Sequence, residues 1–213
     1  MRPFLDIDYK YEPLKPGQFI KGSEYHSICI HHTAGGTTPS TIQWWNTTKD
    51  RVATPFIIDR DGTIYQVFPL SFWAYHLYVA SPGNKVPKKY KHSRYDKHIL
   101  GIELANWGQL TKQNDKFYNY VGREVKNVEE VKYRGYQYWE PYSQAQIKSL
   151  ENLLKILTKE LNIKPKENYK DIFDINMDAL NMVPGIYTHT SYRTDKVDCF
   201  LSPSLLMMLN NLE

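Results

Sequence analysis

The sequence predicts a single α/β domain with one central, mixed β-sheet flanked by α-helices. Short β-branched, apolar segments alternate with segments whose apolar residues recur every three or four positions, the pattern of a sheet covered by helices. The chain contains no internal repeat and no linker, and its 213 residues, 41% of them hydrophobic, suffice for a full core. We therefore expect one domain over residues 23–213, preceded by a polar extension over residues 1–22 that packs on it.

The first strand and helix are predicted from residues 27 to 45. Residues 27–31 are apolar and β-branched enough for a short buried strand. The pair Gly35-Gly36 then provides a turn. Ser40 and Gln43 have the spacing of a capping box, so we expect a helix to begin there and to carry Trp44-Trp45.

A hairpin and a further strand are predicted in the middle of the chain. Segments 56–59 and 63–67 flank Asp61-Gly62, an Asp-Gly signal for a tight turn, and residues 98–105 are a further strand candidate. Between them, residues 85–97 are strongly basic and lack a clear period. We interpret this insertion as a solvated loop, with contact to an anionic polymer as the alternative.

The carboxyl-terminal part contains the strongest helix signal. Residues 114–138 are polar and tyrosine-rich without clean periodicity, so we expect an insertion there. Ser143 and Gln146 then form a capping box. Ser202-Pro203 predicts a short terminal helix, because proline is well tolerated at the first helical position. The apolar face of the long helix consists of Ile147, Leu150, Leu154, Leu157 and Leu161.

Charge and composition exclude several classes of protein. The chain has 27 Lys and Arg against 23 Asp and Glu, and a net charge of +4 is too weak to predict a nucleic-acid binder, although it favours an anionic surface such as a cell-wall polymer. Two cysteines, Cys29 and Cys199, cannot form a disulfide framework, which leaves one bridge between them open. No segment resembles a signal peptide or a membrane span, so we expect a soluble chain without an export signal.

Two groups of residues could bind a metal ion. His31 and His32 end the first strand, where alternation sends their side chains to opposite faces, so only one of them can enter a given site. His189, Lys196 and Asp198 lie within ten residues near the carboxyl terminus. Imidazole and carboxylate are zinc ligands, and three protein ligands with one open position are typical of catalytic zinc. The alternatives are a packed histidine beside one that caps the turn, and an ordinary polar loop.

Glu103 stands between Ile102 and Leu104 in an apolar strand. A carboxylate is expensive to bury there unless it is paired or protonated. Glu103 is therefore either a functional residue or a strand residue that faces water.

Four segments, in this order, make the chain resemble a known family. They are ICIHHTAGG at 28–36, PFIIDRDGTIYQV at 55–67, LGIELAN at 100–106, and His189 followed by KVD at 196–198. Together they resemble the zinc-dependent N-acetylmuramoyl-L-alanine amidases of the type-2 amidase family, which includes the T7 lysozyme-like endolysins and the peptidoglycan recognition proteins. The resemblance covers most of residues 27–200 and implies the fold of that family.

The resemblance implies a zinc site with one Zn²⁺ per chain. The family's two histidine ligands fall on His31 and His189, and its third ligand, a Cys or Asp two residues after a lysine, falls on Asp198. Cys199 stands where many members have proline, so a thiolate could supplement or replace the carboxylate.

The resemblance also assigns catalytic and substrate-binding residues. It implies that Glu103 is the catalytic glutamate and that Lys196 holds the oxyanion. A tyrosine found in some members is absent here, because residues 53–56 are Ala-Thr-Pro-Phe, and this assigns the base function to Glu103. The expected substrate-binding residues are Trp73, His76 and His32; Trp73 and His76 match the family's Trp-His segment at the cleft wall.

The implied activity is hydrolysis of the amide bond between N-acetylmuramic acid and L-alanine in bacterial peptidoglycan. This fits a phage endolysin or a wall-remodelling amidase, and the alternative is a non-catalytic module that binds muropeptides. We expect a monomer that acts at the bacterial cell wall, binds no nucleic acid and does not insert into a membrane.

Overall fold

The main sheet of the computed structural model, which describes residues 7–212, has six strands. Its order is β1-β5-β4-β7-β3-β12, and only β4 and β5 pair antiparallel, so the sheet is mixed, as predicted. The strands are β1 (Lys10–Tyr11), β3 (Ser27–His32), β4 (Phe56–Ile58), β5 (Ile64–Gln66), β7 (Ile99–Leu104) and β12 (Ile186–Thr188).

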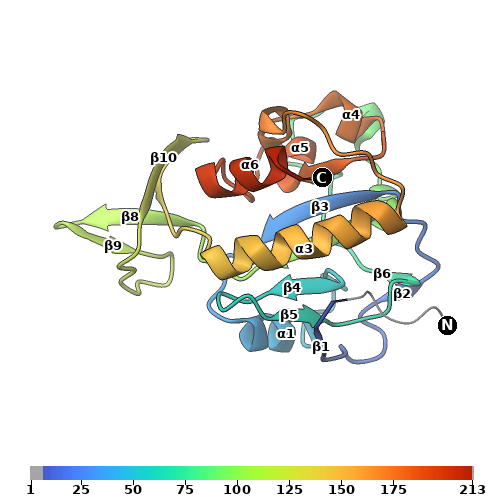
Figure 1. Ribbon diagram of the computed structural model, residues 1–213, viewed down its shortest axis with the longest axis horizontal. Coiled ribbons are helices and arrows are strands. Elements are labelled where there is room, and N and C mark those ends of the chain that lie inside the picture. The colour runs from blue at the N-terminus through green and yellow to red at the C-terminus, as the bar shows by residue number, and fades with distance from the viewer. Residues whose placement is uncertain (1–6, 213) are drawn as a thin grey trace.

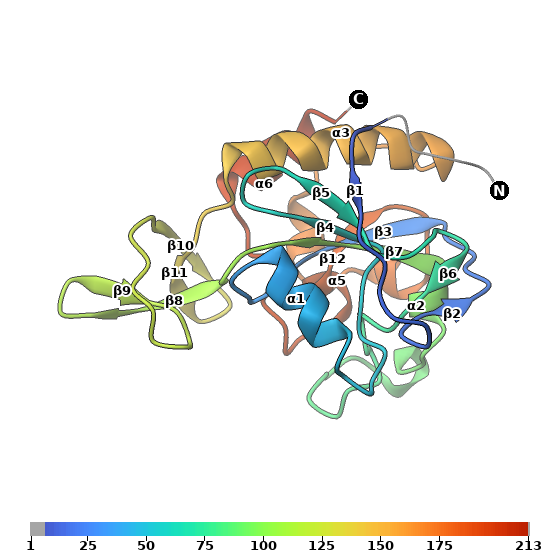
Figure 2. The same cartoon turned by 90° about the horizontal axis from the view of Figure 1, so that it is seen from below.

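Helices cover both faces of this sheet. Figure 2 shows α3 (Gln144–Glu160) on one side and α1 (Thr38–Trp45) on the other, while α6 (Pro203–Asn210) packs beside α3 (Figure 1). Along β4, Ile57 belongs to the apolar cluster under α1, whereas Phe56 and Ile58 belong to the larger cluster under α3. Alternation along the strand therefore supplies both halves of the core.

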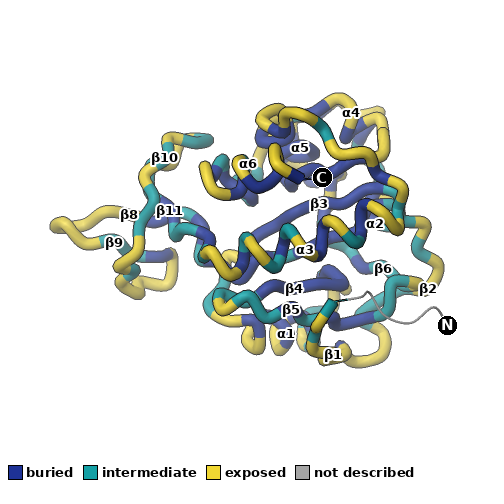
Figure 3. Tube along the Cα trace, in the orientation of Figure 1, coloured by how far each residue is buried: buried dark blue, intermediate teal, exposed yellow. Residues whose placement is uncertain are grey.

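Short elements complete the main body. These are β2 (Ile20–Lys21), β6 (Phe72–Trp73), α2 (Tyr95–His98), α4 (Met177–Leu180), α5 (His189–Tyr192) and the 3₁₀ turns η1 (Lys88–Tyr90) and η2 (Lys170–Phe173). Figure 3 shows that β3 and β4 are buried along their whole length, and β7 is buried at every position except Glu103. Within residues 7–212, no helix is both long and apolar enough to cross a bilayer.

The predicted hairpin, long helix and terminal helix are confirmed. β4 and β5 pair around Gly62, whose φ of +86° is easily adopted only by glycine. Ser143 caps α3, with Gln146 as its capping-box partner. The terminal helix begins at Pro203, directly after Ser202.

The predicted start of α1 is wrong by three residues, nearly one turn. Its N-cap is Thr37, and Ser40 is the third helical residue of the capping box rather than the cap. Pro39 is tolerated in the first turn because the amide there needs no helical partner. The helix therefore starts before the proline.

The insertion predicted at 114–138 is an ordered antiparallel sheet. Its strand order is β10-β11-β8-β9, and it projects from one end of the main body (Figure 1). Two tight turns with positive φ, at Asn114-Asp115 and Arg134-Gly135, connect its hairpins. These turn signals were missed in the sequence. The strands are β8 (Gln109–Gln113), β9 (Lys116–Tyr118), β10 (Glu129–Tyr133) and β11 (Tyr136–Trp139).

The amino-terminal extension contributes one strand to the main sheet and one to the small two-stranded sheet β2-β6. Residues 1–6 of it lie outside the described residues, but β1 forms an edge of the main sheet and β2 pairs with β6. Leu14 is buried in the cluster under α1. The described part of the extension is thus built into the fold rather than lying only on its surface.

Candidate metal centre and active site

Three side chains that are distant in sequence meet at the carboxyl edge of the parallel strands. His31 is near the end of β3, His189 directly follows β12, and Asp198 lies in the loop after α5. β12 pairs with β3 in parallel, Thr188 opposite Ile30, so both histidines leave the sheet at the same edge. Ligands commonly bind at this edge of α/β sheets.

The ligand atoms of this cluster lie close together. His31 Nδ1 is 3.2 Å from His189 Nδ1 and 3.1 Å from Asp198 Oδ2, and His189 Nδ1 is 2.9 Å from the same oxygen. One ligand atom from each residue falls within 4.8 Å of the others, a spacing that could hold one metal ion. The structure therefore brings the three predicted ligands together.

The protein fixes both imidazoles in the same tautomer. His189 Nε2 is 2.9 Å from the carbonyl oxygen of Leu77, which can only accept, so this nitrogen carries the proton. His76 Nε2 likewise donates to Ile99 O at 2.9 Å, which makes His76 Nδ1 an acceptor for His31 Nε2–H, also at 2.9 Å. Both histidines then direct an unprotonated Nδ1 toward the Asp198 carboxylate.

Three acceptor atoms this close together need either a cation or a shared proton between them. Burial lowers the pKa of His31 to about 4, although Asp198 opposes the shift. Burial raises the pKa of Asp198, but in the metal-free protein a proton held between this carboxyl and the neighbouring histidines outweighs burial and keeps that pKa well below its usual range. Neutral imidazoles and an ionised carboxylate are the protonation states that metal binding requires. The donor set therefore fits a divalent ion.

Glu103 lies beside this cluster. It is opposite His31 in the register of β7 with β3, so the two side chains project from the same face. Its Oε2 atom is buried without a hydrogen-bond partner among the described residues. Burial, reinforced by Asp198 and opposed by Lys196, raises the pKa of Glu103 well above its usual value. A carboxyl group of this kind is suited to accepting a proton near neutral pH.

Arg134 holds the loop that carries Lys196 and Asp198 through hydrogen bonds to its backbone. Its guanidinium donates to the carbonyl oxygens of Arg193 and Lys196, both at 2.8 Å, and of Thr190 at 3.1 Å. Arg134 comes from the β10–β11 turn, so the second sheet helps to position the cluster. Lys196 stands two residues before Asp198, and its charge acts on both Glu103 and His31.

Cys199 does not belong to the cluster, and Cys29 and Cys199 are both free. The Cys199 thiol is buried and interacts with the Tyr142 hydroxyl, and burial raises its pKa well above the usual value. Of the two ligands left open in the sequence, the geometry places Asp198 at the site.

The three predicted substrate-binding residues do not line the cluster as a group. His76 uses both ring nitrogens within the protein, in bonds to His31 and to the Ile99 carbonyl oxygen. His32 is buried with its Nδ1 2.9 Å from the Tyr142 hydroxyl, because its side chain leaves β3 on the other face. Trp73 lies in β6, which pairs with β2, and packs edge-on against Tyr75.

Three convergent nitrogen and oxygen donors, beside a carboxyl group with one buried oxygen that has no partner in residues 7–212, are typical of single-metal hydrolases. Comparison with protein families identifies the particular class. Residues 21–199 match the N-acetylmuramoyl-L-alanine amidase family (Amidase_2), so the chain belongs to that family. It is an N-acetylmuramoyl-L-alanine amidase, an enzyme that acts on peptidoglycan.

Solved structures share the fold at low sequence identity. The hydrolase AmiA of Staphylococcus aureus, solved with its ligand, aligns with a TM-score of 0.54 and 14% identity over 97% of this chain and 84% of AmiA. A selenomethionine derivative of AmpD gives 0.51 and 14% over 97% and 94%. PlyL gives 0.50 and 11% over 90% and 86%. Comparison with curated protein sequences finds no match.

Proposed function

We propose that this amidase is zinc-dependent and that His31, His189 and Asp198 hold one Zn²⁺ per chain. The observation that carries the proposal is the convergence of their three ligand atoms within 4.8 Å, with both imidazoles fixed by hydrogen bonds behind them. Nitrogen and carboxylate donors suit zinc, and three protein ligands leave a coordination position open for catalysis.

The proposed scissile bond joins the lactyl group of N-acetylmuramic acid to L-alanine of the stem peptide. The family description supports this substrate. An amide is a poor electrophile and neutral water a poor nucleophile, so hydrolysis requires that both be activated. A bound zinc ion supplies Lewis acidity toward the carbonyl oxygen and makes water more acidic.

Glu103 is the proposed general base and acid. Its unpaired Oε2 faces the same side of the sheet as His31, and its raised pKa lets it take a proton from water and then deliver it to the departing amine. Such proton transfer typically contributes about 10²- to 10⁴-fold in rate.

Lys196 is proposed to stabilise the oxyanion of the tetrahedral intermediate. Its position beside the cluster is supported by its effect on the pKa values of Glu103 and His31. A fixed positive charge is most effective where the site excludes water. The bonds from Arg134 to this loop hold the lysine backbone in place.

Catalysis is favoured over the alternative of a non-catalytic muropeptide-binding module, because the chain has a suitable residue at all three ligand positions and also has Glu103. We further propose that residues 23–213 and the extension act as one monomeric unit at the bacterial cell wall, in phage-induced lysis or in wall remodelling. Light scattering of the purified protein tests the monomer.

Mass spectrometry of peptidoglycan digestion products tests the activity and its dependence on zinc. We expect free stem peptides with an L-alanine amino terminus and glycan strands whose lactyl groups are intact. A chelator should abolish this release and added zinc should restore it. Cleavage at a glycosidic or a peptide-internal bond, or release that survives complete zinc removal, would contradict the proposal.

A further inference from the structure

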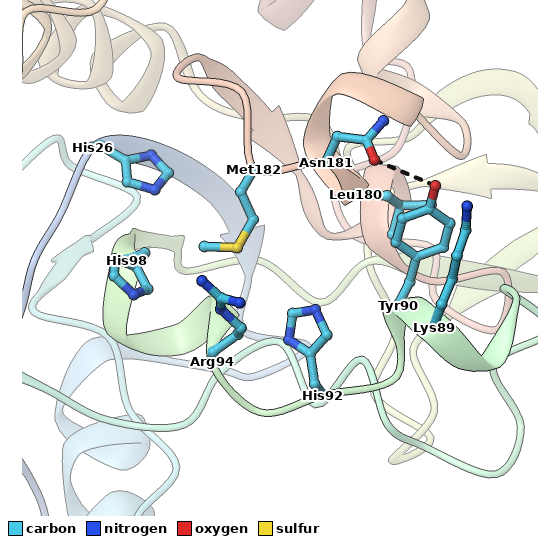
Figure 4. A pocket seen from close by; sticks show the side chains of 9 residues that line it. All are labelled: His26, Lys89, Tyr90, His92, Arg94, His98, Leu180, Asn181 and Met182. Atoms are coloured by element: carbon cyan, nitrogen blue, oxygen red, sulfur yellow. Dashed lines mark hydrogen bonds between the residues drawn. The ribbon is translucent and has the colours of Figure 1, made fainter.

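A pocket lies at the amino ends of the parallel strands, whereas the metal cluster lies at their carboxyl ends. His26 directly precedes β3 and His98 directly precedes β7, so both stand at the amino ends of strands whose carboxyl ends carry His31 and Glu103. Five strand residues span roughly 16 Å, so the two sites are separate. The cavity of about 500 Å³ is lined by Lys89, Arg94 and three histidines, His26, His92 and His98, together with four further residues (Figure 4).

The lining is basic and contains no acidic side chain. Lys89 and Arg94 are exposed, and neither forms an ion pair in the part of the chain that the structure describes. Glu24 lies 3.7 Å from His98 Nδ1 but is not part of the lining, and it is already bonded to Lys97. Two cationic side chains and three imidazoles thus share one cavity without a counter-charge in its wall.

The segment that forms this wall contains the whole positive excess of the chain. Residues 85–97 include six Lys or Arg and one acidic residue, a net +5, which leaves 21 basic against 22 acidic residues in the rest. The acidic residue, Asp96, is buried and accepts bonds from the backbone amides of His76 and Leu77. Its carboxylate therefore serves the fold and does not neutralise the surface.

Aromatic anchors hold the segment in place. The Tyr95 hydroxyl donates to Leu180 O at 2.8 Å, and the Tyr90 hydroxyl donates to Asn181 Oδ1 at 3.3 Å (Figure 4). His92 stacks on Tyr95 with ring centroids 4.3 Å apart, and its Nδ1 is buried without a hydrogen-bond partner in residues 7–212. The basic side chains thus project, solvent-exposed, from a loop whose backbone is anchored by buried aromatic residues.

We propose that this pocket binds phosphate groups of an anionic, phosphodiester-linked wall polymer. The guanidinium of Arg94 and the ammonium of Lys89 match phosphate oxygens, and the neighbouring imidazoles offer further donors. The cavity is large enough for one sugar-phosphate or polyol-phosphate unit. The exposed Lys85 and Lys88 extend the positive surface along the same segment. This proposal depends on the proposed function in one respect: activity on peptidoglycan would bring the protein to the cell wall, where such a polymer occurs.

Titration of the zinc-loaded enzyme with a short polyglycerol phosphate tests the proposal, because this probe contains no amide to hydrolyse. We expect wild-type protein to bind it and Lys89→Ala/Arg94→Ala to bind about tenfold more weakly or worse. The control Lys155→Ala/Lys159→Ala removes the same charge from exposed positions of α3 and should stay within about twofold of wild type. Both variants should release stem peptide from a soluble muropeptide at the wild-type rate.

Three results would overturn the proposal. Equal binding by the two double variants would mean that only net charge matters. Equally tight binding of single-stranded DNA of matched charge would mean that the surface is not selective for a wall polymer. Tighter binding of phosphatidylglycerol vesicles than of polyglycerol phosphate would assign the pocket to a lipid surface. Failure to cleave any muropeptide would contradict the proposed function instead, and polyglycerol phosphate binding would still be measured independently.

Discussion

His76 Nδ1 lies 2.9 Å from His31 Nε2, on the side of the His31 ring that faces away from Asp198. His76 in turn donates to the carbonyl oxygen of Ile99, at the start of β7. A backbone carbonyl thereby determines, through one intervening ring, which nitrogen of His31 is free to bind a metal ion. We infer that His76 is a positioning residue.

Replacing His76 should weaken zinc binding. His76→Leu removes the acceptor behind His31, and loss of such a partner typically costs about 10- to 100-fold in metal affinity. His76→Asn places an amide oxygen near the former Nδ1 position and should retain more of the affinity. Competition with a chelator of known affinity gives the measurement. Equal zinc affinity in both variants and wild type would show that His31 needs no such partner.

Glu103→Gln should stop turnover without releasing zinc. The amide keeps the shape of the side chain but cannot accept a proton as a carboxylate does, so kcat should fall about 10²- to 10⁴-fold. Zinc content by metal analysis should stay near one per chain. Glu160→Gln, at the exposed end of α3, serves as the matched control. Loss of zinc from Glu103→Gln would instead make Glu103 a ligand.

Variants at Asp198 and Cys199 should differ clearly in zinc binding. Asp198→Ala removes the oxygen that lies 3.1 and 2.9 Å from the two histidines and should abolish stoichiometric zinc. Asp198→Cys should keep zinc, because a thiolate is a good ligand. Cys199→Ala should also keep zinc, since that thiol interacts with Tyr142. A Cys199→Ala protein without zinc would reverse the assignment of the third ligand.

The Arg193–Asp195 pair should stabilise the loop after α5, which carries Asp198, in a pH-dependent way. Arg193 donates to Asp195 at 3.0 and 2.7 Å, and this bonding is the main cause of the lowered pKa of the Asp195 carboxyl. Because the folded-state pKa is depressed, the stabilisation is present above the unfolded pKa of about 4 and is lost as pH falls through the folded value. The pair is partly exposed, so we expect only about 0.5–1 kcal/mol.

Urea unfolding of Asp195→Asn at pH 7 and pH 3 measures this contribution. The difference in unfolding free energy from wild type should shrink at the lower pH. Asp50→Asn changes an exposed carboxylate that has no ion pair within the described chain, and it should unfold like wild type at both pH values. A difference for Asp195→Asn that is the same at both pH values would assign the effect to shape rather than charge.

Elements with strong local signals were predicted well. The Asp-Gly turn of the hairpin and the Ser143 cap of α3 act through contacts between neighbours in the chain, so a short window contains the information. The start of α1 was misplaced because two cap residues, Thr37 and Ser40, compete within one turn. The second sheet was missed because its strands are mostly half-exposed and carry no continuous apolar face.

The sequence by itself determined the fold class, the family, and the residues expected to bind zinc, because short motifs in a fixed order contain that information. Only the tertiary structure decided that Asp198 rather than Cys199 reaches His31 and His189, and that His76 bonds to His31 on the side of the ring away from Asp198. The tertiary structure also shows that residues of the basic segment 85–97 line a pocket. The physical reason is that a hydrogen bond or a metal site depends on distance and direction to about an ångström. Those quantities are set by the packing of distant strands and by backbone carbonyls such as those of Leu77 and Ile99, which have no signature in a sequence.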